Sequence, residues 1–349
     1  MTLSLKAPKA EKVAISSGEL SKLVGVDLLV MSKNDDGVWT ATFGPLAPGI
    51  YDYAFDVDGV RVTDPLSKNV FGNRTGSRGY LEVPGSVDAP RIDQWRDVPH
   101  GTVTRHWYKS KATGTTRSVH VYTPPGYTVP NDSAAGTAAA SDAKYPVLYL
   151  LHGSGDDDRH WSQLGQANVI ADNLLATAKI KPMIIVMPEG HPAGAIGVAD
   201  RQAYYAKNRE LFERDLLEDV QPLVEANYRV DKTPAARAIA GLSMGGQQAL
   251  DVGLRHRDQF AWVASFSGAA RNLDEVVSGL AADPAAANKD LKLLWIGIGK
   301  DDFLLPSNHE FVAKLKELQI RHEYHETEGA HNWGVWRGYL AELLPRLFQ

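Results

Sequence analysis

The sequence predicts an α/β protein with a doubly wound sheet, preceded by a small all-β domain. From about residue 117 to the end, apolar segments alternate with segments of helical period. Several of these apolar segments are continuous and are not interrupted by alternating polar residues, as parallel strands covered by helices on both faces require. Before residue 85, apolar and polar residues alternate, and turn sequences such as Asp36-Gly37 and Asp58-Gly59 separate the segments. The first pattern indicates a parallel sheet and the second a compact β-sandwich.

The length of the chain accommodates both domains. It has 349 residues, of which 44% are hydrophobic and 23% are charged, and a globular domain holds about 100–200 residues. We assign residues 1–85 to the β-sandwich, 86–100 to a linker and 101–349 to the α/β domain.

Individual elements follow from the local periodicity. Phe212, Leu216 and Leu223 recur at helical spacing and predict an amphipathic helix from about Asn208 to Asn227. The expected strands are Val24–Met31, Val38–Phe43, Tyr51–Val57 and Tyr80–Val83 in the sandwich, and Val119–Tyr122, Val147–Leu151, Met183–Met187, Ala236–Ala240, Trp262–Phe266, Leu293–Ile298 and His322–Glu326 in the sheet.

Composition and charge argue against several functions. The formal net charge is −5 and no Lys/Arg stripe is present, so we expect no nucleic-acid partner. The chain has no cysteine, which excludes disulfides, thiol nucleophiles and thiolate metal sites. No apolar run reaches the roughly 18 residues of a membrane span. The acidic segment Asp156–His160 lacks calcium-loop spacing and no dinucleotide motif follows the first strand, so we expect neither a metal nor a cofactor.

A Gly-x-Ser-x-Gly motif supplies the candidate nucleophile. The motif, Gly241–Gly245, lies between the expected strand Ala236–Ala240 and a helix-compatible run. A serine hydroxyl is a weak nucleophile, so it must be exposed on a sharp turn beside a base. The glycines permit such a turn, and the N-terminus of the following helix favours developing negative charge. The motif therefore predicts that Ser243 is the nucleophile of an α/β-hydrolase fold.

An acid and then a histidine must follow this nucleophile along the chain. Among the later histidines, only His331 lies in a loop after the last expected strand, where this fold presents its base. The loop after Leu293–Ile298 holds two adjacent carboxylates, Asp301 and Asp302, and at most one of them can face His331. The other is then a solvated or turn-capping residue.

Two backbone N–H groups should stabilise the oxyanion that forms when a nucleophile attacks an ester. One belongs to Met244, the residue after the nucleophile, and we assign the other to Ser154 in the glycine-containing loop after Val147–Leu151. We expect His152, just before this loop, to hydrogen-bond to the backbone rather than to act as a second base.

Several separated motifs resemble those of the esterase-D-like superfamily, in particular the feruloyl and acetyl-xylan esterases of the first carbohydrate esterase family. The resemblance runs from about residue 100 to the end of the chain, and the motifs that carry it lie at residues 145–153, 168–174, 212–217, 241–246 and 329–337.

This resemblance implies a serine esterase with the triad Ser243, Asp302 and His331. In that family the acid ends a Gly-x-x-Asp stretch, which here falls on Asp302, and the base is the histidine of Gly-x-His-x-Trp, here His331. The resemblance also implies that the backbones of Met244 and Ser154 bind the oxyanion. The expected substrates are feruloylated or acetylated xylans, with feruloyl esters preferred.

The N-terminal part resembles the early-set immunoglobulin-like module that precedes glycogen-branching and debranching enzymes. Residues 48–61 and Asp64-Pro65 carry this likeness, which implies a module of the carbohydrate-binding type. We expect a secreted or periplasmic protein whose signal peptide is absent from this sequence, with a cytoplasmic location as the alternative. The oligomeric state is left open.

Two tryptophans are candidate walls for an aromatic acyl group. Trp333 is two residues beyond His331, and Trp161 lies at the start of the helix after the oxyanion loop. A ferulate pocket should combine such apolar walls with a few polar groups. Either ring could instead be packed in the core or at its rim, and Trp336, at helical spacing with Leu340, is expected in the core.

Other functions share these motifs. An acetyl-xylan esterase, a siderophore esterase and a mycolyltransferase all form an acyl-enzyme on such a serine, so the motif does not separate them. A non-catalytic glycan-binding protein on the same fold would have no need of Ser243, Asp302 and His331 in this order.

Overall fold

The computed structural model divides the chain into two compact units, Met1–Gln94 and Trp95–Gln349. The structure describes residues 1–20, 29–74, 76–128, 143–194, 200–268 and 273–349. The boundary between the units falls inside residues 86–100, the predicted linker. Within the described ranges, no helix combines the length and the apolar character needed to cross a membrane.

The first unit consists of two antiparallel sheets around one hydrophobic core. The strand order is β1-β5-β4 in one sheet and β3-β2-β6-β9-β8 in the other, with β7 paired to β6. Leu5 and Trp39 of the first sheet share a buried cluster with Ile15 and Phe55 of the second, so the sheets pack as a sandwich. The strands are β1 (Thr2–Lys6), β2 (Val13–Ser16), β3 (Leu29–Val30), β4 (Ser32–Lys33), β5 (Val38–Thr42), β6 (Gly49–Val57), β7 (Val60–Val62), β8 (Val70–Asn73) and β9 (Gly76–Val83).

The predicted strands of this unit agree with β5, β6 and β9. The predicted strand Val24–Met31 lies largely outside the described residues, and its described end forms β3. The all-β expectation misses a helical turn at residues 18–20. Ser17 explains this turn because its hydroxyl accepts the N–H of Leu20, which is the hydrogen bond of a helix N-cap.

The second unit is built on an eight-stranded sheet with the order β10-β11-β13-β12-β14-β15-β16-β17. The six strands from β13 to β17 in this order run parallel, whereas β11 pairs antiparallel with both β10 and β13, so the predicted parallel sheet is in fact mixed. The strands are β10 (Thr102–Lys109), β11 (Thr116–Thr123), β12 (Val147–Leu151), β13 (Ile184–Pro188), β14 (Arg237–Leu242), β15 (Trp262–Phe266), β16 (Leu293–Gly299) and β17 (Glu323–Thr327).

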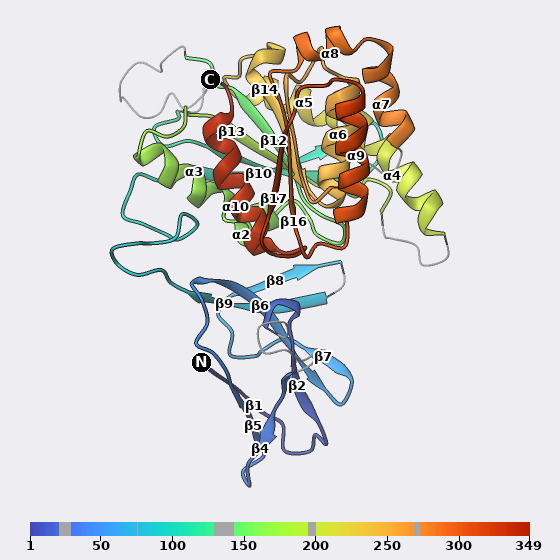
Figure 1. Ribbon diagram of the computed structural model, residues 1–349. Helices are drawn as coiled ribbons and strands as arrows, with labels where there is room; N and C mark the ends of the chain where they lie inside the picture. The colour runs from blue at the N-terminus through green and yellow to red at the C-terminus, as the bar shows by residue number, and fades with distance from the viewer. Residues whose placement is uncertain (21–28, 75, 129–142, 195–199, 269–272) are drawn as a thin grey trace. The chain divides into compact units, whose positions relative to one another are not determined.

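Helices cover both faces of this sheet (Figure 1), as the apolar character of its central strands requires. Helix α10 packs against α3 on one side, while α6 packs against α4 and α7 on the other. The helices are α2 (His160–Gln163), α3 (Ala167–Ala176), α4 (Arg201–Asp215), α5 (Gln221–Asn227), α6 (Met244–Arg255), α7 (Leu273–Ala282), α8 (Pro284–Asp290), α9 (Leu305–Glu317) and α10 (Trp333–Leu343), with short 3₁₀ turns at Pro234–Ala236 and Leu344–Arg346.

The predicted helix from Asn208 to Asn227 is interrupted. Between α4 and α5, residues Leu216–Val220 form a π-helical turn, a wider turn with i to i+5 hydrogen bonds. At its two ends, Asp215 accepts the hydroxyl of Tyr108 at 2.7 Å and Asp219 accepts the N–H of Lys111 at 2.8 Å. Both carboxylates thereby tie this helical segment to the hairpin of β10 and β11.

The strand register brings several loops to one edge of the sheet. Leu151 of β12 pairs with Gly241 of β14, and Leu242 pairs with Phe266 of β15. Farther along, Gly299 of β16 pairs with Thr327 of β17. The carboxyl ends of these parallel strands are therefore level, and the loops that follow them meet in one region, as is general for ligand sites of open α/β sheets.

Candidate active site

Ser243 sits on a strained turn between β14 and α6. Its φ of +52° and ψ of −116° lie in a region that residues with a side chain rarely adopt. A Cβ on Gly241 would come within 2.5 Å of the Gly245 backbone, and one on Gly245 within 2.5 Å of the Leu151 carbonyl oxygen. Both motif glycines are thus required by close backbone contacts, which hold the serine in this conformation.

The turn that carries Ser243 is also hydrogen-bonded to the neighbouring strand β15. The N–H of Ser243 donates to the carbonyl oxygen of Phe266 at 2.8 Å, where β15 ends. One residue farther, the N–H of Ser267 donates to the carbonyl oxygen of Gly297 in β16 at 2.7 Å. Continuous backbone hydrogen bonds therefore connect the nucleophile to the strand that precedes the candidate acid.

The structure brings Ser243, His331 and Asp302 into one hydrogen-bonded series. His331 Nε2 lies 2.9 Å from Ser243 Oγ, and His331 Nδ1 lies 2.8 Å from Asp302 Oδ2. His331 follows β17, and Asp302 follows β16. Asp301, the other carboxylate that the sequence leaves open, is exposed, whereas the Asp302 side chain is fully buried.

Asp302 is held in its charged form. Burial alone would raise the pKa of this carboxyl, but hydrogen bonds from His331 and from the Leu304 N–H, which lies 2.9 Å from Oδ1, keep it below its usual value. An ionised carboxylate at this position can orient the imidazole and stabilise the imidazolium when His331 takes a proton.

The contribution of Ser267 to the environment of Asp302 was not predicted from the sequence. Ser267, which is fully buried, accepts the indole N–H of Trp336 at 3.1 Å, and its hydroxyl contributes to keeping the pKa of Asp302 low. Trp336 lies in the core as expected, yet it also contacts the His331 imidazole edge to face, with ring centroids 4.9 Å apart. The position of Ser267 directly after the strand Trp262–Phe266 was the available signal, because side chains at such strand ends face the site.

The two expected oxyanion donors lie next to the nucleophile. Met244 is the first residue of α6, so its N–H has no acceptor within the helix. Ser154 belongs to the loop after β12, in which a Cβ on Gly153 would lie 3.5 Å from Ser243 Cβ. These contacts place Met244 and the loop that carries Ser154 beside Ser243, and the role of the two N–H groups stays a prediction.

The prediction that Trp161 lines the acyl pocket is wrong. Its side chain is 1% exposed, and its indole N–H donates to the Leu151 carbonyl oxygen at 2.9 Å, so it is a core residue beneath the end of β12. Trp333 is partly buried and packs edge to face on both Trp161 and Trp336, and its contact with substrate stays a prediction.

The comparisons with known proteins agree with this geometry. The Esterase family model matches residues 110–347. The chain belongs to this family. A relative from Xylanibacter ruminicola, an endo-1,4-beta-xylanase/feruloyl esterase, is 32% identical over 351 residues, which cover 99% of this chain and 44% of that protein. The chain therefore spans less than half the length of this relative.

Two solved structures have a similar fold. A ferulic acid esterase from Anaeromyces mucronatus, in complex with ferulic acid, is 23% identical with a TM-score of 0.63, over 73% of this chain and 93% of that one. The enterobactin esterase from Shigella flexneri is 19% identical with a TM-score of 0.71, over 100% of this chain and 92% of that one. At these identities the likeness shows that the chain has an α/β-hydrolase-type fold with a mixed sheet.

Proposed function

We propose that this chain is a serine carboxylic-ester hydrolase that acts through an acyl-enzyme. The observation that carries the proposal is the series of hydrogen bonds from Ser243 through His331 to Asp302. Ser243 Oγ attacks the ester carbonyl carbon while its proton passes to His331 Nε2, and the imidazolium then gives this proton to the leaving alcohol. Water repeats these steps on the acyl-enzyme, which releases the acid and restores Ser243. The N–H groups of Met244 and Ser154 stabilise both tetrahedral intermediates.

The substrate that we propose is a hydroxycinnamate ester, with ferulate released from arabinoxylan. The names of the Xylanibacter ruminicola relative and of the Anaeromyces mucronatus structure support it. Phe303 also supports it, because its side chain is 71% exposed and its ring packs on the His331 imidazole, with centroids 4.6 Å apart. This ring can stack on a planar acyl group or a sugar ring beside the reacting atoms. It follows the acid directly in the sequence, which was the signal that could have identified it.

The substrate proposal predicts that the enzyme prefers a ferulate ester to an acetate ester because of Phe303. Methyl ferulate and methyl acetate share a leaving group, and kcat/KM should be higher for the ferulate ester. Phe303→Ala should cost the ferulate reaction about 1–3 kcal/mol in kcat/KM, because an apolar contact of the aryl group is lost, and should spare acetate. Steady-state kinetics on both esters measure this difference.

Trp107→Ala is the matched control for Phe303→Ala. Its ring is also largely exposed, but it lies on β10, six strands away from β16 in the sheet, so neither ester should be affected. A tenfold preference for acetate would instead make the chain an acetyl-xylan esterase on the same triad. Hydrolysis of a catecholate siderophore ester in preference to both would favour the function named for the Shigella flexneri structure. An added alcohol acceptor distinguishes an acyltransferase, because transfer to it would compete with hydrolysis.

For the first unit we propose an immunoglobulin-like module of the carbohydrate-binding type that holds the chain on xylan. Its two-sheet architecture supports this proposal. We further propose that the protein acts outside the cytoplasm, in the periplasm or after secretion, because polymeric xylan is found there. Fractionation of the source cells followed by immunodetection tests this location, and recovery in the cytoplasmic fraction would contradict it.

Native electrophoresis in a gel that contains arabinoxylan tests the module. The full chain with Ser243→Ala should be retarded, and the same variant without residues 1–94 should not. Truncation should also lower activity on feruloylated arabinoxylan more than activity on methyl ferulate, since only the polymer offers a second attachment point. Equal losses on both substrates, with the remaining unit folded, would argue against a substrate-directed role.

A further inference from the structure

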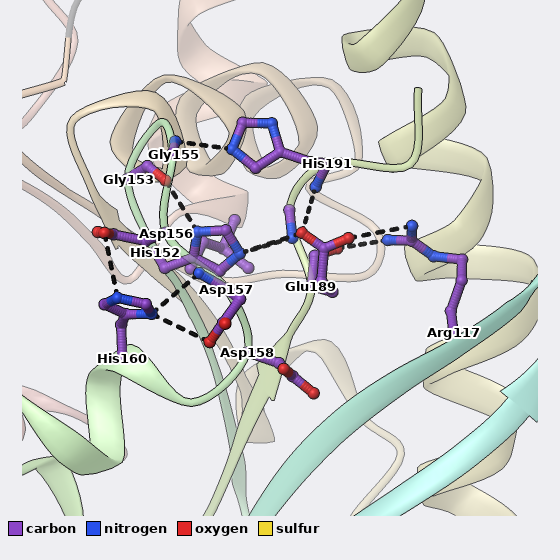
Figure 2. A network of polar contacts seen from close by, with 12 residues as sticks. Arg117, His152, Gly153, Gly155, Asp156, Asp157, Asp158, His160, Glu189 and His191 are labelled. Atoms are coloured by element: carbon purple, nitrogen blue, oxygen red, sulfur yellow. Dashed lines mark hydrogen bonds and ion pairs between the residues drawn. The ribbon is translucent and has the colours of Figure 1, made fainter. Parts of the chain in front are cut away.

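The loop that carries Ser154 is held at both ends by buried histidines (Figure 2). His152 Nδ1 lies 2.8 Å from the carbonyl oxygen of Gly153, and the N–H of Gly155 donates to His191 Nε2 at 2.9 Å. Both histidines are 1% exposed. These two bonds flank Ser154 on either side, so they define the position of its peptide groups.

The hydrogen bonds place a proton on Nδ1 of each histidine. His152 Nδ1 faces the Gly153 carbonyl oxygen, to which it can only donate. Its Nε2 lies 2.7 Å from the Gly190 nitrogen and 3.7 Å from Glu189 Oε1, and although burial lowers the pKa of this imidazole, the Glu189 carboxylate outweighs burial and raises it. His191 Nε2 accepts from Gly155, so its proton is also on Nδ1, which lies 2.7 Å from the Tyr204 hydroxyl oxygen. The Tyr204 hydroxyl can then donate to the carbonyl oxygen of Gly194 at 3.2 Å.

This arrangement fixes the direction of the Ser154 N–H. In a planar trans peptide, the carbonyl and the following N–H point in opposite directions. Because His152 holds the Gly153 carbonyl, the Ser154 N–H must point away from His152. His191 restrains the next peptide, and Gly155 has a φ of +91°, which favours glycine and completes the turn.

Other contacts hold His191 itself in place. Its backbone N–H donates to Glu189 Oε1 at 3.0 Å, and Glu189 Oε2 lies 3.3 Å from Arg117 Nη1 on β11. Helix α4 contributes Tyr204 and also Tyr205, whose hydroxyl lies 2.9 Å from Ser154 Oγ. Helix α4 therefore contacts the oxyanion loop both directly and through His191.

We propose that His191 is a positioning residue for the oxyanion loop, and that Tyr204 keeps it in the tautomer that accepts the Gly155 N–H. This inference rests on the proposed function, because it concerns how the Ser154 N–H is aligned with the oxyanion. The negative charge develops only after Ser243 attacks, so the alignment stabilises the transition state and not the bound ester. Its loss should therefore appear in kcat rather than in KM.

Substitution of His191 tests the proposal through this division between kcat and KM. His191→Leu should lower kcat for methyl ferulate about tenfold to hundredfold, with KM within about twofold of wild type. His191→Gln should recover most of the loss, because its Oε1 can lie near the position of Nε2 and accept the Gly155 N–H. Tyr204→Phe should lower kcat about threefold to tenfold, because Nδ1 loses its acceptor and the proton can move to Nε2.

His106→Leu is the matched control. His106 is also paired with a tyrosine hydroxyl, that of Tyr228, but it lies on β10 at the edge of the sheet, three strands from β12 and the loop that follows it, so kcat should not change. If His191→Leu does not fold, His191→Gln and Tyr204→Phe decide the question. Wild-type kcat in His191→Leu or Tyr204→Phe, or equal kcat losses in folded His191→Leu and His191→Gln, would overturn the inference. A wild-type chain that hydrolyses no ester would instead overturn the proposed function.

Discussion

Ser243→Ala should lower kcat for ester hydrolysis by a factor on the order of 10⁴ or more, and His331→Ala should lower it by a similar factor. Ser243 supplies the attacking oxygen, and His331, 2.9 Å away, is the group that can take its proton. Because the two act as one unit, the double variant should be little worse than either single variant. Steady-state rates with methyl ferulate measure all three losses.

Ser278→Ala is a suitable control for this experiment. Ser278 lies on α7 and its hydroxyl donates to the carbonyl oxygen of Glu275, so its loss should leave kcat unchanged. Covalent labelling by a fluorophosphonate should likewise require Ser243 and not Ser278. Near-normal turnover by Ser243→Ala would remove the basis for the proposed mechanism.

Asp302→Asn should reduce kcat by roughly 10³–10⁴, whereas Asp301→Asn should retain most of the activity. An amide at residue 302 no longer provides the negative charge that stabilises the His331 imidazolium, and it can turn its NH₂ group toward the ring and select the wrong tautomer. Asp301 is exposed and serves as the matched control, since the same chemical change is made one residue away. The opposite ranking of the two variants would assign the acid to Asp301.

The pH dependence should follow from the same geometry. The pKa of Asp302 is held below its usual value, so this carboxyl stays ionised as the pH falls through the range in which a histidine gains its proton. The pH profile of kcat/KM, measured with methyl ferulate, should therefore show no loss of activity from protonation of Asp302 in that range.

The sequence predicts the sheet of the second unit well because its central strands are continuous apolar runs. Val147–Leu151 and Trp262–Phe266 match β12 and β15 at both ends. The edge strand β10 was missed, since Thr102–Lys109 is rich in polar residues and exposes one side to solvent. The π-helical turn at Leu216–Val220 was also missed, because apolar spacing does not register a single wider turn.

The arrangement of Ser243, Asp302 and His331 could be anticipated because chain order and strand ends constrain it. Side-chain direction is less accessible to sequence reasoning. Trp161 lies on the four-residue helix α2, too short for a periodic pattern to show which of its faces is buried. The role of Ser267 was equally hard to predict, since it depends on the hydrogen bond from Trp336 and on the effect of the Ser267 hydroxyl on the pKa of Asp302.

The backbone hydrogen bonds at the end of β15 have a consequence for how the site responds to heat. The amides of Ser243 and Ser267 bond to neighbouring interior strands, at the carboxyl ends of β14 and β15, at 2.8 and 2.7 Å. Amides in such positions exchange their hydrogen for deuterium only when a large part of a domain opens. The amides of Ser243 and Ser267 should thus be among the slowest-exchanging in the second unit. Esterase activity should accordingly persist on warming until that unit unfolds as a whole.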